Sequence, residues 1–286
     1  MGDARDMDGG TLFVVATPIG NLADLSKRAR TTLEEVALIA AEDTRHTGGL
    51  LASCGIGTRT VALHDHNEAR RVPELIAQLE TGDDIALVSD AGTPLLADPG
   101  FRLVRAAVAA GLRIRPVPGP CAITTALSVA GLPTDRFRFE GFLPAKTGAR
   151  RAALAEFKGE AATVVFYEAP HRIRAMLADL AVAFGEARPA WVGRELTKQY
   201  ESHRSGPLAT LAALFESGEE PARGEFVVVV AGIERSAPAS SLDAVVLLRE
   251  LLEELPAARA AKVAARLTGA ARAELYALAL GIAAER

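Results

Sequence analysis

Four short segments of the sequence combine glycine, proline and charged side chains directly after apolar runs: residues 17–21, 42–46, 64–68 and 89–100. Carboxylates and imidazoles can move protons, and glycine lets the main chain approach a ligand closely. Because the carboxyl ends of strands in an open α/β sheet meet at one edge, the four segments are expected to surround one small-molecule site. Segment 89–100, Ser-Asp-Ala-Gly-Thr-Pro-Leu-Leu-Ala-Asp-Pro-Gly, is its expected floor. For any single segment the alternative is that glycine and proline merely end a strand.

Two of these segments also allow metal chemistry. His64, His66 and Asp43 are residue types that ligate zinc, and together they would suit a metal-dependent hydrolase. Against this alternative, Asn67 and Glu68 are typical of a helix start, and histidines beside carboxylates more often form hydrogen bonds. Standard phosphate-loop and dinucleotide motifs are absent from the sequence. We therefore expect an enzyme site without a metal.

Basic side chains occur in groups that could contact a polyanion. Lys146, Arg150 and Arg151 lie in one short stretch, and the C-terminal region carries a basic stripe at helical spacing, formed by Arg259, Lys262 and Arg266. Each group is equally compatible with an ordinary solvent-facing surface. Glu42 and Arg45 are spaced to form an ion pair that shapes their own loop.

The overall composition limits the class of protein. The chain has 286 residues, 49% of them hydrophobic, a net charge of −4 and two cysteines, Cys54 and Cys121. This length suggests two α/β lobes and a small appendage, while the mild acidity gives no global sign of nucleic-acid binding. No apolar run approaches the roughly 18 residues of a membrane helix, and the start lacks the pattern of a signal peptide. We therefore expect a soluble protein of a reducing cytoplasm.

The apolar periodicity predicts the elements that position the four segments. Strands are expected at 11–16, 37–41, 60–63, 85–88 and 113–117, alternating with helices, with Asp24 and Asn67 as helix N-caps. The proline-rich residues 116–120 are the expected boundary to a second α/β lobe with a mixed sheet. The predicted division is a flexible tail at 1–10, lobes at 11–118 and 119–233, and a linker with a three-helix appendage at 234–286.

Longer motifs carry a family resemblance. They are Val-Ala-Thr-Pro-Ile-Gly-Asn-Leu at 15–22, Ala-Glu-Asp-Thr-Arg-His-Thr at 41–47, Leu-His-Asp-His-Asn-Glu at 63–68, Val-Ser-Asp-Ala-Gly-Thr-Pro at 88–94, Pro-Gly-Pro-Cys-Ala at 118–122 and Glu-Gly-Phe-Leu-Pro-Ala-Lys at 140–146. In this order they resemble the ribosomal RNA methyltransferases of the tetrapyrrole methylase superfamily. The resemblance covers about residues 11–232 and extends more loosely into the appendage. It implies two α/β lobes with a cofactor cleft between them, and a homodimer.

The resemblance also implies a reaction and its residues. The reaction is transfer of a methyl group from S-adenosylmethionine to the ribose 2′-hydroxyl of a cytidine in the decoding region of 16S ribosomal RNA, as naked RNA or in the small subunit. The implied cofactor contacts are Pro18, Asp90, Ala91, Gly92, Thr93, Leu96, Cys121, Ala122, Tyr167 and Leu196. Asp43, His64 and Asp90 are the candidates for removing the hydroxyl proton. Arg45, His46, Lys146, Arg150 and Arg151 are the candidates for holding RNA phosphates.

Two further alternatives stay open beside the metal hydrolase. One is a C-methyltransferase of the same fold that acts on a tetrapyrrole, although it would need a broad apolar cleft rather than a basic mouth. The other is a non-catalytic ribosome-binding module whose basic appendage does the work. Binding of S-adenosylmethionine would distinguish the enzyme from this module.

Overall fold

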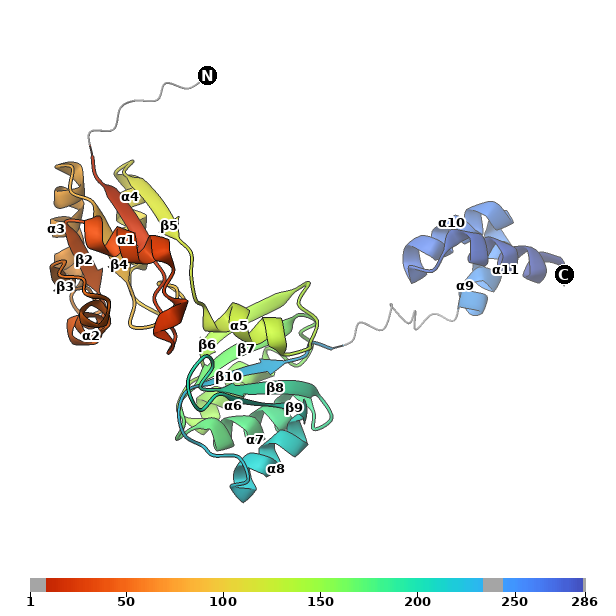
Figure 1. Ribbon diagram of the computed structural model, residues 1–286. Coiled ribbons are helices and arrows are strands. Elements are labelled where there is room, and N and C mark those ends of the chain that lie inside the picture. Colours follow the sequence, from red (N-terminus) through yellow and green to blue (C-terminus); the bar gives the residue numbers. More distant parts are fainter. Residues whose placement is uncertain (1–8, 234–243, 285–286) are drawn as a thin grey trace. The chain divides into compact units, whose positions relative to one another are not determined.

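The computed structural model describes residues 9–233 and 244–284, which fall into two compact units, one ending at Gly232 and the other beginning at Ile233. Residues 1–8 of the tail predicted at 1–10, and residues 234–243, where the linker is predicted, lie outside the described residues. The larger unit contains two five-stranded sheets, and the smaller one is helical (Figure 1).

The first sheet is entirely parallel, as the alternation of apolar strands and helices predicts. Its strands are β1 (Thr11–Val15), β2 (Leu38–Ala41), β3 (Thr60–Ala62), β4 (Ile85–Val88) and β5 (Arg113–Val117), in the order β3-β2-β4-β1-β5. This order places the carboxyl ends of β1, β2 and β4 next to one another. β2 and β4 are buried along their whole length, which explains their uninterrupted apolar sequences.

Helices cover both faces of this sheet. Helices α1 (Lys27–Glu35) and α2 (Thr44–Cys54) pack on one face, and α3 (Glu68–Glu80) and α4 (Phe101–Ala109) pack on the other. Of the two predicted N-caps, Asp24 is wrong, whereas Asn67 does occupy the N-cap position of α3. Ser26 caps α1 by accepting from the Ala29 N–H, while Asp24 lies in the preceding 3₁₀ turn, Leu22–Asp24.

Asn67 stands directly before α3 but makes no side-chain cap bond. Its amide oxygen accepts from the His64 N–H at 2.9 Å, and its amide nitrogen donates to the Ala62 carbonyl at 3.0 Å. The Asn67 side chain therefore stabilises the turn after β3, while its main-chain carbonyl accepts the first hydrogen bonds of the helix.

The second sheet is mixed, as predicted. Its strands are β6 (Phe137–Phe142), β7 (Thr163–Glu168), β8 (Pro189–Arg194), β9 (Ser202–Pro207) and β10 (Phe226–Val230), in the order β6-β7-β10-β8-β9. β6 and β7 are parallel, and the other pairs are antiparallel. Helices α6 (Thr147–Ala155), α7 (Ile173–Phe184) and α8 (Leu208–Ser217) cover one face, and α5 (Ala122–Val129) packs on the other.

The smaller unit consists of α9 (Ala244–Glu254), α10 (Ala257–Thr268) and α11 (Arg272–Ala284), which confirms three predicted helices. They enclose their own apolar core, centred on Leu248, Ala261 and Leu275. Gly269 ends α10 in the left-handed conformation, at φ 73°, as expected for a glycine at a helix C-terminus. Within the described residues, no helix combines the length and the apolar character needed to cross a membrane.

Candidate functional site

The loops that follow β1 and β4 are joined directly. Thr17 and Gly92 exchange two main-chain hydrogen bonds, with N···O distances of 2.9 and 3.1 Å. The Thr93 hydroxyl donates to the Pro120 carbonyl at 3.1 Å, which ties the same loop to the segment after β5. Residues far apart in the sequence therefore form one rigid edge, at the carboxyl ends where ligands collect in open α/β sheets.

The shape of the 89–100 loop depends on left-handed main-chain positions. Gly92 has φ 76°, and a Cβ added there would stand 3.2 Å from the Ile19 Cγ2 atom. Leu95 and Ala97 also have positive φ values, 74° and 69°, which are uncommon for side chains of their kind. The buried carboxylate of Glu68 accepts from the Gly100 N–H at 2.9 Å and fixes the end of the loop. The loop is thus held in one strained conformation, which is characteristic of functional sites.

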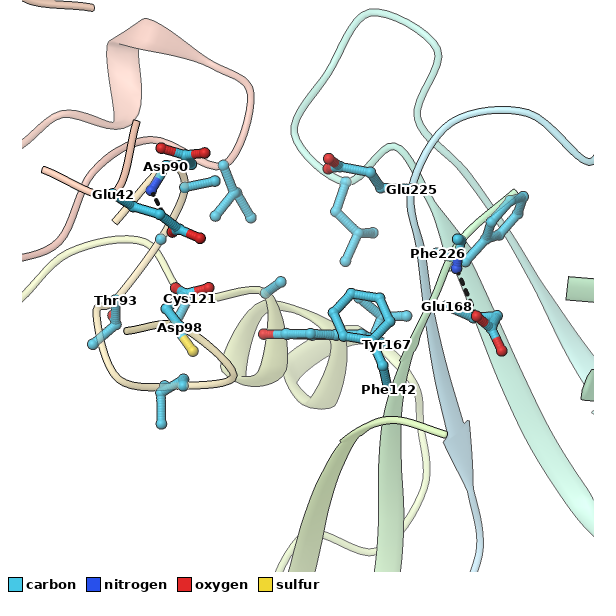
Figure 2. Close-up of a pocket in the computed structure, with 18 of the residues that line it drawn as sticks. Glu42, Asp90, Thr93, Asp98, Cys121, Phe142, Tyr167, Glu168, Glu225 and Phe226 are labelled. Carbon is cyan, nitrogen blue, oxygen red and sulfur yellow. Dashed lines mark hydrogen bonds between the residues drawn. The ribbon is translucent and has the colours of Figure 1, made fainter. Parts of the chain in front are cut away.

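A first cavity of about 450 Å³ opens beside this loop (Figure 2). It is lined by nine of the ten residues that the family resemblance implies as cofactor contacts: Asp90, Ala91, Gly92, Thr93, Leu96, Cys121, Ala122, Tyr167 and Leu196. The tenth, Pro18, lines a second cavity instead. Both sheets contribute to the first cavity, because Tyr167 lies near the end of β7 while Asp90 follows β4.

One wall of the first cavity is aromatic and apolar. The Tyr167 ring meets Phe139 and Phe142 edge to face, at centroid distances of 4.9 and 5.7 Å. Figure 2 shows its hydroxyl directed into the cavity, toward the side where Cys121 and Asp98 lie. Burial raises the pKa of Tyr167, so the hydroxyl stays protonated and can donate a hydrogen bond.

The opposite wall carries three carboxylates, from Glu42, Asp90 and Asp98. The Asp90 N–H donates to the Glu42 carboxylate at 3.4 Å. Burial raises the pKa of Glu42. Burial also raises the pKa of Asp98 to about 6, where the nearby Glu42 and Asp90 act in the same direction and a hydrogen bond from Ser89 opposes them. An acidic wall of this kind favours a ligand that brings its own positive charge.

The second cavity, of about 570 Å³, adjoins the first. It lies between the segment after β1, from Pro18 to Leu22, and α2, and it shares Ile19, Asp90, Ala91 and Glu225 with the first cavity. Arg45 and His46, two of the predicted RNA contacts, line it. It is the more polar and more basic of the two spaces.

The structure gives the side chains of the three candidate catalytic residues different surroundings. Of Asp43, His64 and Asp90, only Asp90 lines these two cavities, and it lines both. Asp43 caps α2, accepting from the Arg45 N–H at 2.8 Å and pairing with the Arg45 guanidinium, which lowers its pKa. His64 makes its contact with the Asn67 amide, 3.2 Å from its Nε2 atom. The expected ion pair between Glu42 and Arg45 is wrong, because Arg45 turns to Asp43 instead.

The metal-hydrolase alternative required His64, His66 and Asp43 to converge. The two imidazole rings approach each other edge to face, with centroids 6.0 Å apart. Across residues 9–233 and 244–284, however, no three His, Cys, Asp or Glu side chains are grouped so that they could hold a metal ion. The convergence that this alternative predicts is therefore not found in the described part of the chain.

The basic residues near the start of α6 have different surroundings. Arg150 is only 2% exposed, and its guanidinium forms an ion pair with the buried Asp179 at 2.6 Å. Arg150 cannot reach an RNA phosphate, so the prediction that it contacts RNA is wrong. Arg151 also contacts Asp179, at 2.7 Å, but its side chain stays 61% exposed. Lys146 is exposed at the N-terminus of α6 and remains accessible to a polyanion.

Several cavity residues were not singled out from the sequence. Asp98 lies inside the 89–100 loop, two residues before its final glycine, but nothing local marks its side chain as facing the ligand space. Glu225 lines both cavities and binds Lys198 at 2.9 Å. The Lys198 stem in turn lies against Gly20, where an added Cβ would be 2.3 Å from its Cγ atom. Only a glycine at position 20 permits this contact.

These features define a two-lobed α/β ligand-binding protein. A strained glycine-rich loop lies at the carboxyl end of a parallel sheet, and the cavity beside it is also lined by a mixed second sheet. Residues 11–212 match the model of the Tetrapyrrole (Corrin/Porphyrin) Methylases, and residues 238–283 match that of the RsmI C-terminal HTH domain. The chain belongs to the Tetrapyrrole (Corrin/Porphyrin) Methylases and is a methyltransferase.

Curated relatives match almost the whole chain. "Ribosomal RNA small subunit methyltransferase I" of Xylella fastidiosa is 53% identical over 93% of this chain and 98% of its own length. The protein of the same name from Pseudomonas aeruginosa is 52% identical over 96% of this chain and 98% of its own. Among solved structures, the cobalamin biosynthetic enzyme cobalt precorrin-4 methyltransferase is similar with a TM-score of 0.58, covering 80% of this chain and 98% of that one at 13% identity. This last likeness concerns the fold alone.

Proposed function

We propose that this protein uses S-adenosylmethionine to methylate the ribose 2′-hydroxyl of a cytidine in the decoding region of 16S ribosomal RNA. The observation that carries the proposal is the first cavity, which gathers nine of the ten implied cofactor contacts around one space. The near-complete match to relatives named for methylation of small-subunit ribosomal RNA supports the acceptor. Work on ribosomal RNA would place the protein in the cytoplasm.

The residues of the first cavity fit this cofactor. S-adenosylmethionine supplies a methyl group on a positively charged sulfur and also carries an ammonium group, both of which suit the wall of Glu42, Asp90 and Asp98. Tyr167 and the apolar Leu196 would hold the adenosine portion. Gly92 leaves the main chain open to close approach, because a Cβ there would occupy the cradle beside Ile19.

Asp90 is the proposed acceptor of the hydroxyl proton. It is the only one of the three candidates that lines the cavities, and it stands in the wall common to both of them. The Asp43 N–H donates to its Oδ1 atom at 3.0 Å, which fixes the carboxylate in place. A ribose hydroxyl is a weak nucleophile until its proton leaves, so a carboxylate held at this boundary would assist the transfer.

RNA contacts would come from Arg45, His46, Lys146 and Arg151, which are all exposed. Such cations position the phosphate backbone without reading sequence. A homodimer is part of the proposal because the superfamily resemblance implies it. The tetrapyrrole alternative rests on fold neighbours of 13% to 22% identity, whose likeness does not extend to the substrate.

The deciding experiment uses methyl-labelled S-adenosylmethionine and small ribosomal subunits that lack the modification. The protein is expected to transfer label to the ribose of one cytidine, located by nuclease digestion and mass spectrometry. Label on a base would overturn the assigned acceptor atom, and failure to bind the cofactor would overturn the function. Tyr167→Ala should weaken cofactor binding at least about tenfold, because it removes a half-buried aromatic ring from the cavity wall.

A further inference from the structure

One face of α2 forms the floor of the second cavity. The α2 residues that line the cavity are Arg45, His46, Gly49, Leu50 and Ser53. Their spacing of one, three or four residues places them on a single side of the helix. Pro18, Ile19, Gly20 and Leu22, in the segment after β1, line the cavity as well. Most of the cavity lining therefore comes from regular elements and their adjoining loops in the first lobe, and the ion-paired Lys198 and Glu225 of the second lobe complete it.

Two adjacent glycines, Gly48 and Gly49, lie in the interior of this helix. A glycine inside a helix is less stable than alanine by about 1 kcal/mol. Neither position requires glycine for the protein's own structure, because both are helical and a Cβ added at either one meets no atom within 4 Å. Gly49 lines the second cavity and Gly48 does not. A side chain at position 49 would enter space that the protein itself leaves unfilled.

The lining has the chemistry of a nucleotide site. Ile19, Leu22 and Leu50 offer apolar surface for a base, while Arg45 and His46 offer exposed positive or hydrogen-bonding groups for a phosphate. The wall shared with the first cavity contains Asp90 and Ala91. A ribose held in the second cavity would thus present its hydroxyl to the boundary where Asp90 stands.

We infer that the second cavity holds the single ribonucleotide that accepts the methyl group, and that Gly49 keeps the floor of this site open. The inference rests on the proposed function and adds the location of the acceptor to it. A cavity that encloses one nucleotide requires that nucleotide to leave its stack, as happens when enzymes act on one unit of a nucleic-acid strand. The acceptor would therefore be an unpaired or extruded residue of the RNA.

The test compares Gly49→Leu with Gly48→Leu in the full-length protein. The two positions are neighbours on one helix, and only position 49 faces the cavity, so Gly48→Leu is a matched control. Both variants should be at least as stable to heat as the parent, because leucine favours a helix more than glycine does. Gly49→Leu should lower kcat/KM for small ribosomal subunits about a hundredfold. A shift of the acceptor by about 1 Å is enough to misalign the ribose oxygen with the methyl group. Gly48→Leu should change kcat/KM less than about threefold.

Affinity for S-adenosylmethionine, measured by calorimetry without RNA, should be the same in both variants and the parent. Gly49→Ala, which fills less space, should have an intermediate effect on kcat/KM. Full activity of Gly49→Leu, an equal loss in Gly48→Leu, or loss of cofactor binding in Gly49→Leu would each overturn the inference. If the parent protein itself transfers no methyl group to subunits, the proposed function fails instead, so the two failures are distinguishable.

Discussion

The main-chain N–H of Asp43 donates a hydrogen bond to the carboxylate of Asp90, with an N···O distance of 3.0 Å. The contact joins the end of β2 to the end of β4, 47 residues further along the chain. It gives the two acids different roles, because Asp43 contributes its main chain to the site while Asp90 contributes its side chain.

This relationship predicts different effects for two similar substitutions. Asp90→Asn should lower kcat about a hundredfold at saturating cofactor, because the proton acceptor is lost. Asp43→Asn should change kcat less than about threefold, since asparagine is an equally good N-cap and the main-chain N–H remains. Steady-state methyl transfer to subunits measures both. Comparable losses in the two variants would show that the Asp43 side chain takes part directly.

Asp98 gives the protein a pH-dependent stability. Its pKa is raised from an ordinary 3.8 to about 6, so the folded state binds this proton more tightly than the unfolded state. The unfolded state therefore loses this proton first, and the free energy of unfolding falls as pH rises from about 4 to about 6. Above that range Asp98 is ionised in both states and causes no further change. Asp98→Asn should raise the free energy of unfolding near neutral pH relative to the parent, with the gain shrinking toward about pH 4.

Urea denaturation of the cofactor-free protein across this pH range measures the effect. Asp135→Asn is the matched control, because Asp135 is exposed in the same unit of the chain. The carboxylates of Glu42 and Asp90 face Asp98 and contribute to the profile, together with the Ser89 hydroxyl. A stability gain in Asp98→Asn that does not vary with pH would contradict the assignment.

Substitutions at Arg150 and Lys146 should affect different properties, folding stability at Arg150 and RNA binding at Lys146. Arg150→Ala should lower the free energy of unfolding by about 3 kcal/mol, because it removes a buried partner of Asp179 and leaves only Arg151. Lys146→Ala should change stability by less than about 0.5 kcal/mol, since Lys146 is exposed. It should instead weaken subunit binding and reduce the salt dependence of that binding by about one unit of slope. Thermal melts and filter binding distinguish the two; a normal melt for Arg150→Ala would contradict the buried ion pair.

The smaller unit should contribute to RNA binding through α10. Arg259, Lys262 and Arg266 are exposed on this helix, which carries no acidic residue. Replacing all three with glutamine should weaken subunit binding. The slope of log binding constant against log salt concentration should become smaller in magnitude by about two to three. Exchange of the exposed Arg70, Lys158 and Arg174 for glutamine makes the same change in net charge and serves as the control. Equal slopes in the two triple variants would contradict the prediction, because binding would then depend on net charge and not on the position of the cations on α10.

The sequence by itself determined the kinds of element and their order. Apolar runs bounded by glycine and proline predicted the parallel first sheet and the mixed second sheet, because burial on both faces leaves a clear local pattern. The 89–100 loop was recognisable as well, since the glycines that take its left-handed positions are part of its own sequence. Nine of the ten residues that the family resemblance implies as cofactor contacts line one cavity.

Only the tertiary structure decided which side chains share a space. The strand order β3-β2-β4-β1-β5 brings the ends of β1, β2 and β4 together, and that order depends on contacts between distant residues. It directs Asp90 into both cavities while Asp43 caps a helix, although both follow buried strands. Packing against Asp179 likewise buries Arg150 beside the exposed Lys146. Local sequence reports a residue's type and its element, but the fold decides where its side chain points and what it meets there.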